Sequence, residues 1–574
     1  MVHSGEELLA IARRKLQVLK CNKQLNNRPY QEVCQNIARK IYFELGQPFE
    51  SDESLRKLPE QIHPLVLEEV EKIVCADENR NEKTLTAILS VLHLLLSPKT
   101  KSFQVGWLTS CSRPDTIDSC QLRVINILAA SAPNLKSLTL DDSTGVKPLS
   151  RFPLITKEII SAILQIKTLK SLSTGRFFIV DDHLIKICKK LNFLHCLQAN
   201  IIFKDKSSLS KLVKTMRDNL KHLKDFRFDR IAVKDGKELK DDYQVFPKEL
   251  VKCCLKHIPR LQIVKSLVTD PKSQAMNFLD SIKGPSNLCH VHLSNGSSLK
   301  GLILLPRVTH FKMTWDASPS FIPRKLSTIQ SPFSSTNRSP MPVFPNVEYL
   351  HLEGLSLSLN LLRFAIQYGK TLHTLIVDAR AGSNLTVNLN DLSIHCPNVQ
   401  SLHLGGIELS ADSIINSFPH LKHLKLILLN RNAVKLSNFL AVPALINVDI
   451  RAIRFDIEDV ITVSSKIKAG NVLMSLEAFR LECMPYDTIK TDEFAAISNL
   501  VKLACAFLPN MRAIQLDVTY FPPIPNTPEK DSNGPIPASF RKKAAIFEAL
   551  GDRNLILFLI EFGMSSKNDW NCDT

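Results

Sequence analysis

Histidines are the residues of this chain that can change charge near neutral pH, and several of them are concentrated in a few short stretches. Histidine titrates between about pH 5 and pH 8, and six of the 16 histidines alternate with apolar residues in short stretches. Alternate residues of a β-strand point to the same face of a sheet. The polar positions of these stretches are His290, His292, His310, Lys312, Tyr349, His351, Ser401, His403, His423 and Lys425.

Two interpretations of this face stay open. It is a surface for a protein partner whose affinity changes between about pH 5 and pH 7, or it is simply the solvated side of a sheet, which polar side chains of moderate size suit. Neighbouring strands lie about 4.8 Å apart. Either interpretation therefore predicts rows of side chains that cross several strands.

Other chemistry is not supported by the residues. The adjacent Cys253 and Cys254 diverge by about 100° on a helix, and no further ligand pair lies at the spacing of a zinc site, so they are expected to pack in the core. The chain lacks GxxxxGKS/T, HExxH, GxSxG and CxxC motifs. We expect neither an enzyme nor a bound metal or cofactor.

The cysteines and the apolar segments indicate a reducing compartment. Fourteen cysteines are sparse in 574 residues, and most lie in apolar stretches, where free cysteine behaves as a small hydrophobic residue. The amino-terminal segment has no signal-peptide pattern. The apolar segment 85–96 is shorter than the roughly 20 residues that cross a bilayer. These features predict a protein of the cytoplasm, or of the nucleus, without a membrane span.

The charge is strongly basic, with a formal net charge of +17. Residues 204–272 hold 18 Lys and Arg against 10 Asp and Glu, which would suit an acidic partner. The lysines of 204–226 recur at helical spacing opposite apolar residues, as on a solvated helix face. Because no aromatic residues alternate with them in the sequence, nucleic acid is not expected as a partner.

A short strand motif recurs along most of the chain. Clear copies are "APNLKSLTL" at 132–140, "FPNVEYLHL" at 344–352 and "FPHLKHLKL" at 418–426. Fourteen copies follow one another at intervals of about 29 residues, between 20 and 41. Their first apolar positions are Leu135, Leu169, Leu194, Leu220, Leu261, Leu288, Val308, Val347, Leu372, Val399, Leu421, Leu445, Leu476 and Met511.

This LxxLxL motif resembles that of the leucine-rich repeat family over residues 120–520. The resemblance implies an α/β fold, an irregular and curved leucine-rich repeat solenoid with a parallel sheet on its concave face. Segments such as 359–369 and 435–442 carry helical spacing and are predicted to return the chain between strands. In "CPNVQSLHLGGIELS" (396–410), we expect the strand to end at Gly405-Gly406.

Three regions follow from this pattern. Residues 1–115 are predicted to be an all-helical amino-terminal region, and residues 116–520 the solenoid. The Ser/Pro-rich segment 316–345 is predicted to be a mobile loop within it. Residues 521–574 are predicted to be a Pro-rich linker with a helical cap at 541–563.

The amino-terminal region carries a second resemblance. Tyr30, Cys34 and Ala38, with Ile37 on the same apolar face, resemble the von Hippel-Lindau box that docks elongin C in substrate receptors of cullin-RING ubiquitin ligases. Leu58-Pro59, Ile62 and Val66 resemble the cullin box that follows it. Tyr30 stands where the family usually has leucine. The pattern also resembles an F-box, which docks a Skp-type adaptor, and any amphipathic helix of an ordinary cap shows the same spacing.

These resemblances imply a function without chemistry of the chain's own. The amino-terminal helices would recruit elongin and a cullin, or a Skp-type adaptor, and the concave face would hold a protein substrate close to the ubiquitin donor. The alternative is a leucine-rich repeat scaffold, adaptor or inhibitor with no link to a ubiquitin ligase.

Overall fold

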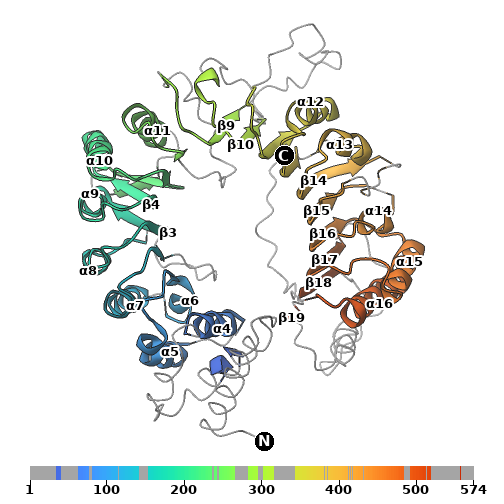
Figure 1. Ribbon diagram of the computed structural model, residues 1–574, viewed down its shortest axis with the longest axis horizontal. Coiled ribbons are helices and arrows are strands. Elements are labelled where there is room, and N and C mark those ends of the chain that lie inside the picture. The colour runs from blue at the N-terminus through green and yellow to red at the C-terminus, as the bar shows by residue number, and fades with distance from the viewer. Residues whose placement is uncertain are drawn as a thin grey trace, which may run out of the picture. The chain divides into compact units, whose positions relative to one another are not determined.

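The chain forms two compact units, and each is described by itself (Figure 1). Unit 1 comprises Met1–Gln274 and Phe278–Leu288, and unit 2 comprises Ala275–Asn277 and Cys289–Thr574. The computed structural model describes residues 34–35, 37–39, 63–76, 81–113, 115–140, 153–235, 238–241, 245–264, 282, 284–294, 302–315, 343–380, 382–383, 385–410, 413, 415, 418–430, 432–483, 491–511, 513–518 and 556–557.

Unit 1 alternates helices and strands. Its helices are α4 (His63–Ala76), α5 (Glu82–Leu95), α6 (Gly106–Thr109), α7 (Ile117–Ser131), α8 (Lys157–Ile163), α9 (Asp181–Lys190), α10 (Lys206–Asn219) and α11 (Val245–His257). Its strands are β1 (Ser102–Gln104), β2 (Ser137–Thr139), β3 (Ser171–Val180), β4 (Cys196–Phe203), β5 (Asp225–Arg227), β6 (Ile231–Asp235), β7 (Glu238–Asp241) and β8 (Ile263–Val264). The strands pair in the order β1-β2-β3-β4-β5-β8, and β6 pairs with β4 and β7.

Unit 2 continues the alternation with a longer sheet. Its strands are β9 (His290–Ser294), β10 (His310–Thr314), β11 (Tyr349–Leu355), β12 (Thr374–Ala379), β13 (Thr386–Val387), β14 (Ser401–Leu409), β15 (His423–Leu428), β16 (Asn447–Ala452), β17 (Ala478–Cys483), β18 (Ala513–Val518) and β19 (Ile556–Leu557). Its helices are the 3₁₀ turn η2 (Leu302–Leu304), α12 (Ser358–Tyr368), α13 (Leu389–His395), α14 (Ser437–Leu440), α15 (Ile457–Lys468) and α16 (Thr491–Phe507). Neighbouring strands follow sequence order from β9 to β19, with β13 attached to β14 alone.

The predicted leucine-rich repeat fold is confirmed. Apart from the antiparallel pair β6 and β7, the strand pairs that the structure describes are parallel. All fourteen first apolar positions of the sequence motif are buried, so each repeat adds to one continuous core within its unit. In both units, helices lie along one side of the sheet, α7 to α11 in unit 1 and α12 to α16 in unit 2 (Figure 1).

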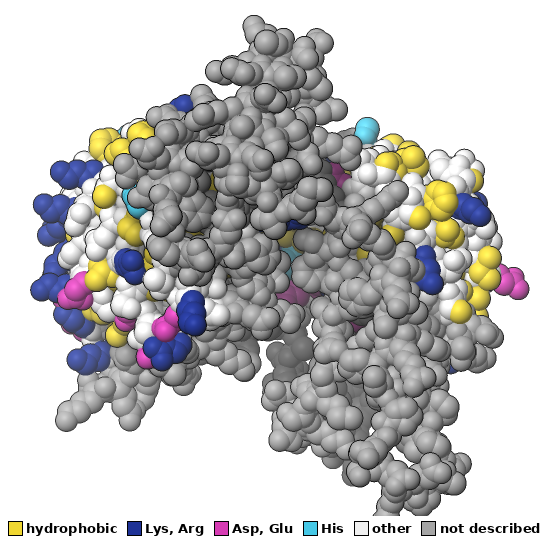
Figure 2. All heavy atoms as spheres, turned by 90° about the horizontal axis from the view of Figure 1, so that it is seen from below, with side chains coloured by type: hydrophobic (Ala, Val, Ile, Leu, Met, Phe, Trp, Pro, Cys, Tyr) yellow, Lys and Arg dark blue, Asp and Glu magenta, His cyan; other side chains and the backbone are white. Residues whose placement is uncertain are grey.

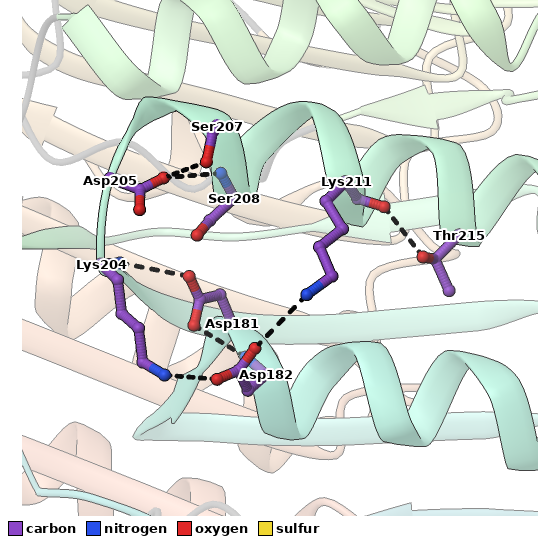
Figure 3. A network of polar contacts seen from close by, with 8 residues as sticks. All are labelled: Asp181, Asp182, Lys204, Asp205, Ser207, Ser208, Lys211 and Thr215. Atoms are coloured by element: carbon purple, nitrogen blue, oxygen red, sulfur yellow. Dashed lines mark hydrogen bonds and ion pairs between the residues drawn. The ribbon is translucent and has the colours of Figure 1, made fainter.

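Side chains that accept hydrogen bonds from helix amino termini explain where several helices begin. Asn81 accepts bonds from the backbone N–H groups of Lys83 and Thr84 at the start of α5. Asp205 accepts one from Ser208 at the start of α10, as Figure 3 shows. These side chains satisfy N–H groups that have no partner within the helix. Asp205 lies two residues after the end of β4, so it fixes the point at which the chain passes from the strand into the returning helix.

The expected end of a strand at Gly405-Gly406 is wrong. β14 continues to Leu409, and its register against β15 shifts between Gly405 and Ile407. Gly406 has a φ of 69°, a conformation that glycine adopts at little cost. The two glycines therefore form a bulge, and the rest of β14 pairs with β13 through Glu408 and Leu409. Sequence alone does not distinguish a glycine that ends a strand from one that forms a bulge.

The expected all-helical character of residues 1–115 is wrong, while the three region boundaries stay predictions. β1 lies at Ser102–Gln104, inside the region 1–115 that was expected to be all-helical, and it pairs with β2. A strand of three residues is too short to show an alternating pattern. Residues 316–342 of the predicted loop and nearly all of 519–574 lie outside the described residues. Within the predicted cap 541–563, the structure describes only β19, which pairs in parallel with β18.

Candidate functional site

Ten predicted side chains come together on one face of the sheet in unit 2, which we call the open face. His290, His310, Tyr349, Ser401 and His423 lie in one row across β9, β10, β11, β14 and β15, with Thr374 of β12 between Tyr349 and Ser401. His292, Lys312, His351, His403 and Lys425 lie in the next row, with Ile376 between His351 and His403. The strand register therefore arranges these ten side chains in two rows, and their role as a partner surface stays a prediction.

The structure extends both rows and adds a third. The first row continues through Asn447, Ala478 and Ala513, and the second through Asp449, Arg480 and Gln515. The third row, absent from the sequence prediction, contains Thr314, Glu353, Asp378, Gly405, Ile427, Arg451 and Glu482. The same alternation of residues, continued by two positions along each strand, would have identified this row.

At one end of the open face, aromatic rings lie over one another. The rings of His290 and His310 are 4.1 Å apart between centroids and 15° from parallel, and those of His310 and Tyr349 are 5.2 Å apart and 21° from parallel. Burial raises the pKa of the Tyr349 hydroxyl, and the carboxylate of Asp378 adds to this effect. Three neighbouring repeats thus present a flat aromatic surface.

Asp378 is the centre of the charge arrangement in the middle of the open face. Its Oδ2 lies 2.8 Å from Nε2 of His351, and its Oδ1 lies 3.8 Å from Nε2 of His403. Burial alone would raise the pKa of Asp378, but the hydrogen bond from His351 and the nearby charges of His403 and Lys312 hold it below its usual range. Gly405 leaves room for this carboxylate, because a Cβ there would lie 2.7 Å from Oδ1.

Lys312 is on the predicted face, but it is not exposed. Its side chain is 1% exposed, and its Nζ lies 2.6 Å from Oε2 of Glu353. Glu353 also accepts a hydrogen bond of 3.3 Å from the Thr314 hydroxyl, which in turn lies 2.7 Å from Nε2 of His292. Polar contacts therefore join β9, β10 and β11 across the open face.

A second group of charges lies on β16 and β17. Nε of Arg451 lies 3.4 Å from Asp449 and 3.2 Å from Glu482, and Nη2 of Arg480 lies 3.0 Å from Glu482. Nε of Arg480 is 3.8 Å from Asp449. Two arginines and two carboxylates thus compensate one another. Such a network fixes the shape and charge pattern of the surface, although partly exposed pairs add little stability individually.

The open face is hollowed beside the first group of charges and over part of the second, since His403, Asp449 and Arg480 are among the lining residues. The hollow has a volume of about 460 Å³ and extends over β14 to β18. Ala478 and Ala513 line it with small side chains, and Lys425 lines it with an ammonium group. Among the residues that the structure describes, Lys425 makes no hydrogen bond or ion pair. The hollow therefore offers a cation beside a shallow apolar surface.

The burial of His403 predicts a pH dependence. Burial lowers the pKa of His403, and the charges of Lys425 and His351 support this against the attraction of Asp378 and Asp449. As the pH falls through the unfolded pKa of about 6.5, the unfolded chain takes up a proton here before the folded chain does. The contribution of His403 to stability is therefore full above that pH and decreases below it.

We expect His403→Gln to reduce the loss of stability between pH 7.5 and pH 5.5. Urea unfolding of the wild type and the variant at both pH values measures this difference. His423→Gln, a change of an exposed ring on the same face, is the control. A loss of the same size in His403→Gln as in the wild type would show that His403 is not the titrating group.

The chain has a leucine-rich repeat fold. No protein-family model and no curated protein sequence match it. Among solved structures it is similar to an internalin from Listeria monocytogenes, with 13% identity and a TM-score of 0.27, over 62% of this chain and 78% of that one. It is also similar to the leucine-rich repeat ectodomain of the Arabidopsis thaliana receptor kinase GASSHO1/SCHENGEN3, determined in complex with CASPARIAN STRIP INTEGRITY FACTOR 2, with 14% identity and a TM-score of 0.28. That match covers 69% of this chain and 43% of the ectodomain.

The predicted docking residues in unit 1 are described only in part. Tyr30, Leu58, Pro59 and Ile62 lie outside the described residues. Cys34 is 1% exposed and Ala38 is 0% exposed. Burial raises the pKa of the Cys34 thiol to about 11, with a further contribution from the carboxylates of Glu69 and Glu68 in α4. Cys34 therefore lies close to α4 and is covered by the chain itself.

The other two docking candidates differ in exposure. Val66 of α4 is fully buried, whereas Ile37 is half-buried. A partner that binds through Cys34, Ala38 and Val66 would first have to displace the elements that cover these residues.

The described residues hold no group of three or more His, Cys, Asp or Glu side chains that could bind a metal ion. Cys254 is buried in α11 and Cys253 is half-buried, in keeping with core packing. No described helix is both long enough and apolar enough to cross a membrane.

Proposed function

We propose that the chain binds a protein segment on the open face of unit 2, in the hollow over β14 to β18. The observation that carries this proposal is the hollow itself, where Lys425 lies beside Ala478 and Ala513. Among the described residues Lys425 makes no ion pair, although Asp449 lies opposite it on β16. Its ammonium group therefore favours a carboxylate of the partner. The small side chains leave space for an apolar side chain next to it. The leucine-rich repeat fold supports this proposal, because such sheets present extended binding surfaces.

Rigidity of the surroundings supports the same proposal. The charges of Asp378 and of Arg451, Arg480 and Glu482 are compensated within the sheet. A partner would not need to reorder them, so little conformational entropy would be lost on binding. In this proposal the chain binds and positions a protein, and no residue of the open face performs a reaction.

Filling the hollow is expected to abolish binding. Ala478→Trp would occupy the apolar part, and Lys425→Glu would reverse the charge that the partner carboxylate contacts. We expect each change to reduce the recovery of the bound protein at least tenfold, which corresponds to about 1.4 kcal/mol. Quantitative mass spectrometry after affinity purification of the full chain measures this recovery.

The control variants introduce a tryptophan and a charge reversal on α15, away from the open face. Thr462→Trp adds the same ring to an exposed position, and Lys466→Glu reverses an exposed charge. Both variants should retain the partners of the wild type. If no protein is lost selectively from Ala478→Trp and Lys425→Glu, the hollow is not the binding site.

A narrower proposal is that the chain is a substrate receptor of a cullin-RING ubiquitin ligase. It is supported by the sequence pattern around Cys34 and Leu58, and the burial of Cys34 and Ala38 counts against it unless the amino-terminal helices rearrange. It predicts that elongin C and a cullin, or a Skp-type adaptor, copurify with the chain. Ile37→Asp, at a half-buried position of the same helix, should then remove them. If Ile37→Asp has no effect, or neither adaptor is recovered, the chain is a leucine-rich repeat scaffold, adaptor or inhibitor without a ligase.

A further inference from the structure

The amino-terminal edge of the sheet in unit 1 carries a regular series of basic residues. Across five successive repeats, the backbone N–H of one residue donates a hydrogen bond to the backbone carbonyl oxygen of its equivalent in the preceding repeat. The donor and acceptor pairs are Lys136 and Lys101, Lys170 and Lys136, His195 and Lys170, and Lys224 and His195, with N to O distances of 2.7 to 2.9 Å. The five residues therefore occupy equivalent positions in five successive repeats, about 4.8 Å apart. The four lysines are exposed, and His195 is half-buried. We call these residues the basic edge.

The repeat fold does not require this charge. In unit 2, the equivalent backbone positions are linked in the same way and are Cys289, Thr309, Glu348, His373, Gln400, Lys422, Ile446 and Glu477. Only one of these is a lysine, and two are glutamates. In unit 1 the series continues to Gln262, whose backbone N–H donates to the carbonyl oxygen of Lys224 at 2.7 Å. Lysine at four of these six positions is therefore a property of that unit's surface and not of the backbone geometry.

Carboxylates are almost absent from the basic edge. The turns that form it, residues 98–101, 133–137, 167–171, 191–196, 220–225 and 259–263, contain eight Lys or Arg and one carboxylate. That carboxylate, Asp225, is paired with Arg227 at 2.7 Å. Burial lowers the pKa of His195, and the charges of Lys170, His222 and Lys224 lower it further.

Other acidic groups of these repeats lie at the opposite edge, where the helices begin. The carboxylate of Asp181 accepts hydrogen bonds from the backbone N–H groups of Asp182 and Lys204 (Figure 3). The carboxylate of Asp182 forms ion pairs with the side chains of Lys204 and Lys211. These carboxylates compensate lysines of α10 and suit the positive end of each helix dipole. At the basic edge, Asp218 at the end of α10 pairs with Arg217 and lies near Lys221. Among the described residues, however, Lys136, Lys170 and Lys224 form no ion pair.

Two aromatic side chains lie in the middle of the basic edge. The Phe193 ring, with the residue 54% exposed, lies 6.4 Å from the His222 ring and 15° from parallel to it. The His222 ring lies 5.6 Å from that of His195. Phe193 and His222 are far apart in the sequence but occupy equivalent turns of neighbouring repeats. The pairing arises from the stacking of two repeats, so neighbouring positions in the sequence do not reveal it.

We propose that the basic edge binds single-stranded nucleic acid. Lys136, Lys170 and Lys224 would contact successive phosphates, and a base would stack on the exposed ring of Phe193. Positive charge along a line with an exposed aromatic platform is the combination that single-strand binding uses. A duplex fits less well, because its bases are already stacked on one another. An acidic polypeptide would satisfy the lysines but would leave the ring without a function.

The test is fluorescence anisotropy of the full chain with a labelled 20-nucleotide oligouridine at several salt concentrations. We expect Lys136→Gln/Lys170→Gln/Lys224→Gln to weaken binding at least tenfold. The slope of log affinity against log salt should become shallower by about 2, because each lost phosphate contact contributes about 0.7. Phe193→Ala should weaken binding about tenfold without changing the slope.

A matched control separates the basic edge from general charge. Lysines also cover the helices of unit 1, and Figure 2 shows Lys and Arg side chains gathered on the side where Figure 1 places α8 to α10. Lys186→Gln/Lys214→Gln/Lys248→Gln removes the same charge from exposed positions of α9, α10 and α11, and it should have little effect.

Two results would overturn the proposal. One is an equal loss of affinity in the edge variant and in the helix control. The other is a 20-residue polyglutamate that competes as well as the oligonucleotide while Phe193→Ala has no effect, which would assign the edge to an acidic polypeptide. Circular dichroism of every variant confirms that the compared chains are folded.

Discussion

Glu353→Leu is expected to lower the free energy of unfolding of unit 2 by about 3 kcal/mol. The variant leaves the ammonium group of Lys312 buried without the carboxylate that lies 2.6 Å from it in the wild type. Removing one member of a buried ion pair typically costs 3 to 5 kcal/mol. We expect the lower end of that range, because the side chain of Glu353 is 27% exposed and water can reach part of the site.

A double variant tests whether the loss of stability comes from the unpaired charge of Lys312. The double variant Lys312→Met/Glu353→Leu removes both charges and retains most of the packing volume, so it should be close to the wild type in stability. Trp315, which packs edge-to-face on Phe364 in unit 2, reports urea unfolding when Trp107 and Trp570 are replaced by phenylalanine. A double variant as unstable as Glu353→Leu would show that the loss does not come from an unpaired lysine.

Gly369→Ala is expected to cost about 3 kcal/mol. A Cβ at this position would lie 2.1 Å from the carbonyl oxygen of His395, 2.4 Å from that of Ala365 and 2.7 Å from the Sγ of Cys396. Two of the three atoms belong to the backbone, so the ends of α12 and α13 would have to separate. The φ of Gly369 is −57°, which alanine adopts freely, so the expected loss is due to steric overlap alone.

Gly470→Ala is the matched control for this prediction. Gly470 has a φ of 71°, and a Cβ there would meet no atom within 4 Å. Its expected cost is about 1 kcal/mol, from backbone strain alone. Urea unfolding of both variants, followed by the fluorescence of Trp315, compares the two costs. Equal stability of the two variants would indicate that α12 and α13 separate easily.

Local patterns in the sequence were sufficient to predict the repeat fold. The first apolar position of each repeat determines the core, and all fourteen such positions are buried. Alternation within each strand placed ten polar side chains on one face. These predictions succeeded because strand periodicity is a property of a few neighbouring residues.

Features that depend on contacts between repeats were not predictable from one sequence. The burial of Lys312 follows from Glu353 in the next strand, and the pairing of Phe193 with His222 follows from the stacking of two turns. The bulge at Gly406 depends on β13, which offers a second strand for β14 to pair with. The division into two units near residue 288 likewise has no local signal in the repeat spacing.

The alignment of the rows on the open face is independent of repeat length. Val308 and Val347 are 39 residues apart, and Val399 and Leu421 are 22 apart. In both cases, however, the five residues of each following strand that span the three rows pair residue for residue. The extra residues of the longer repeat therefore lie in the connections between strands and not in the strands themselves. Doubling the length of a flexible connection costs only about 0.6 kcal/mol. A fluorescent or epitope tag inserted between β10 and β11 should therefore leave every contact of the open face in place.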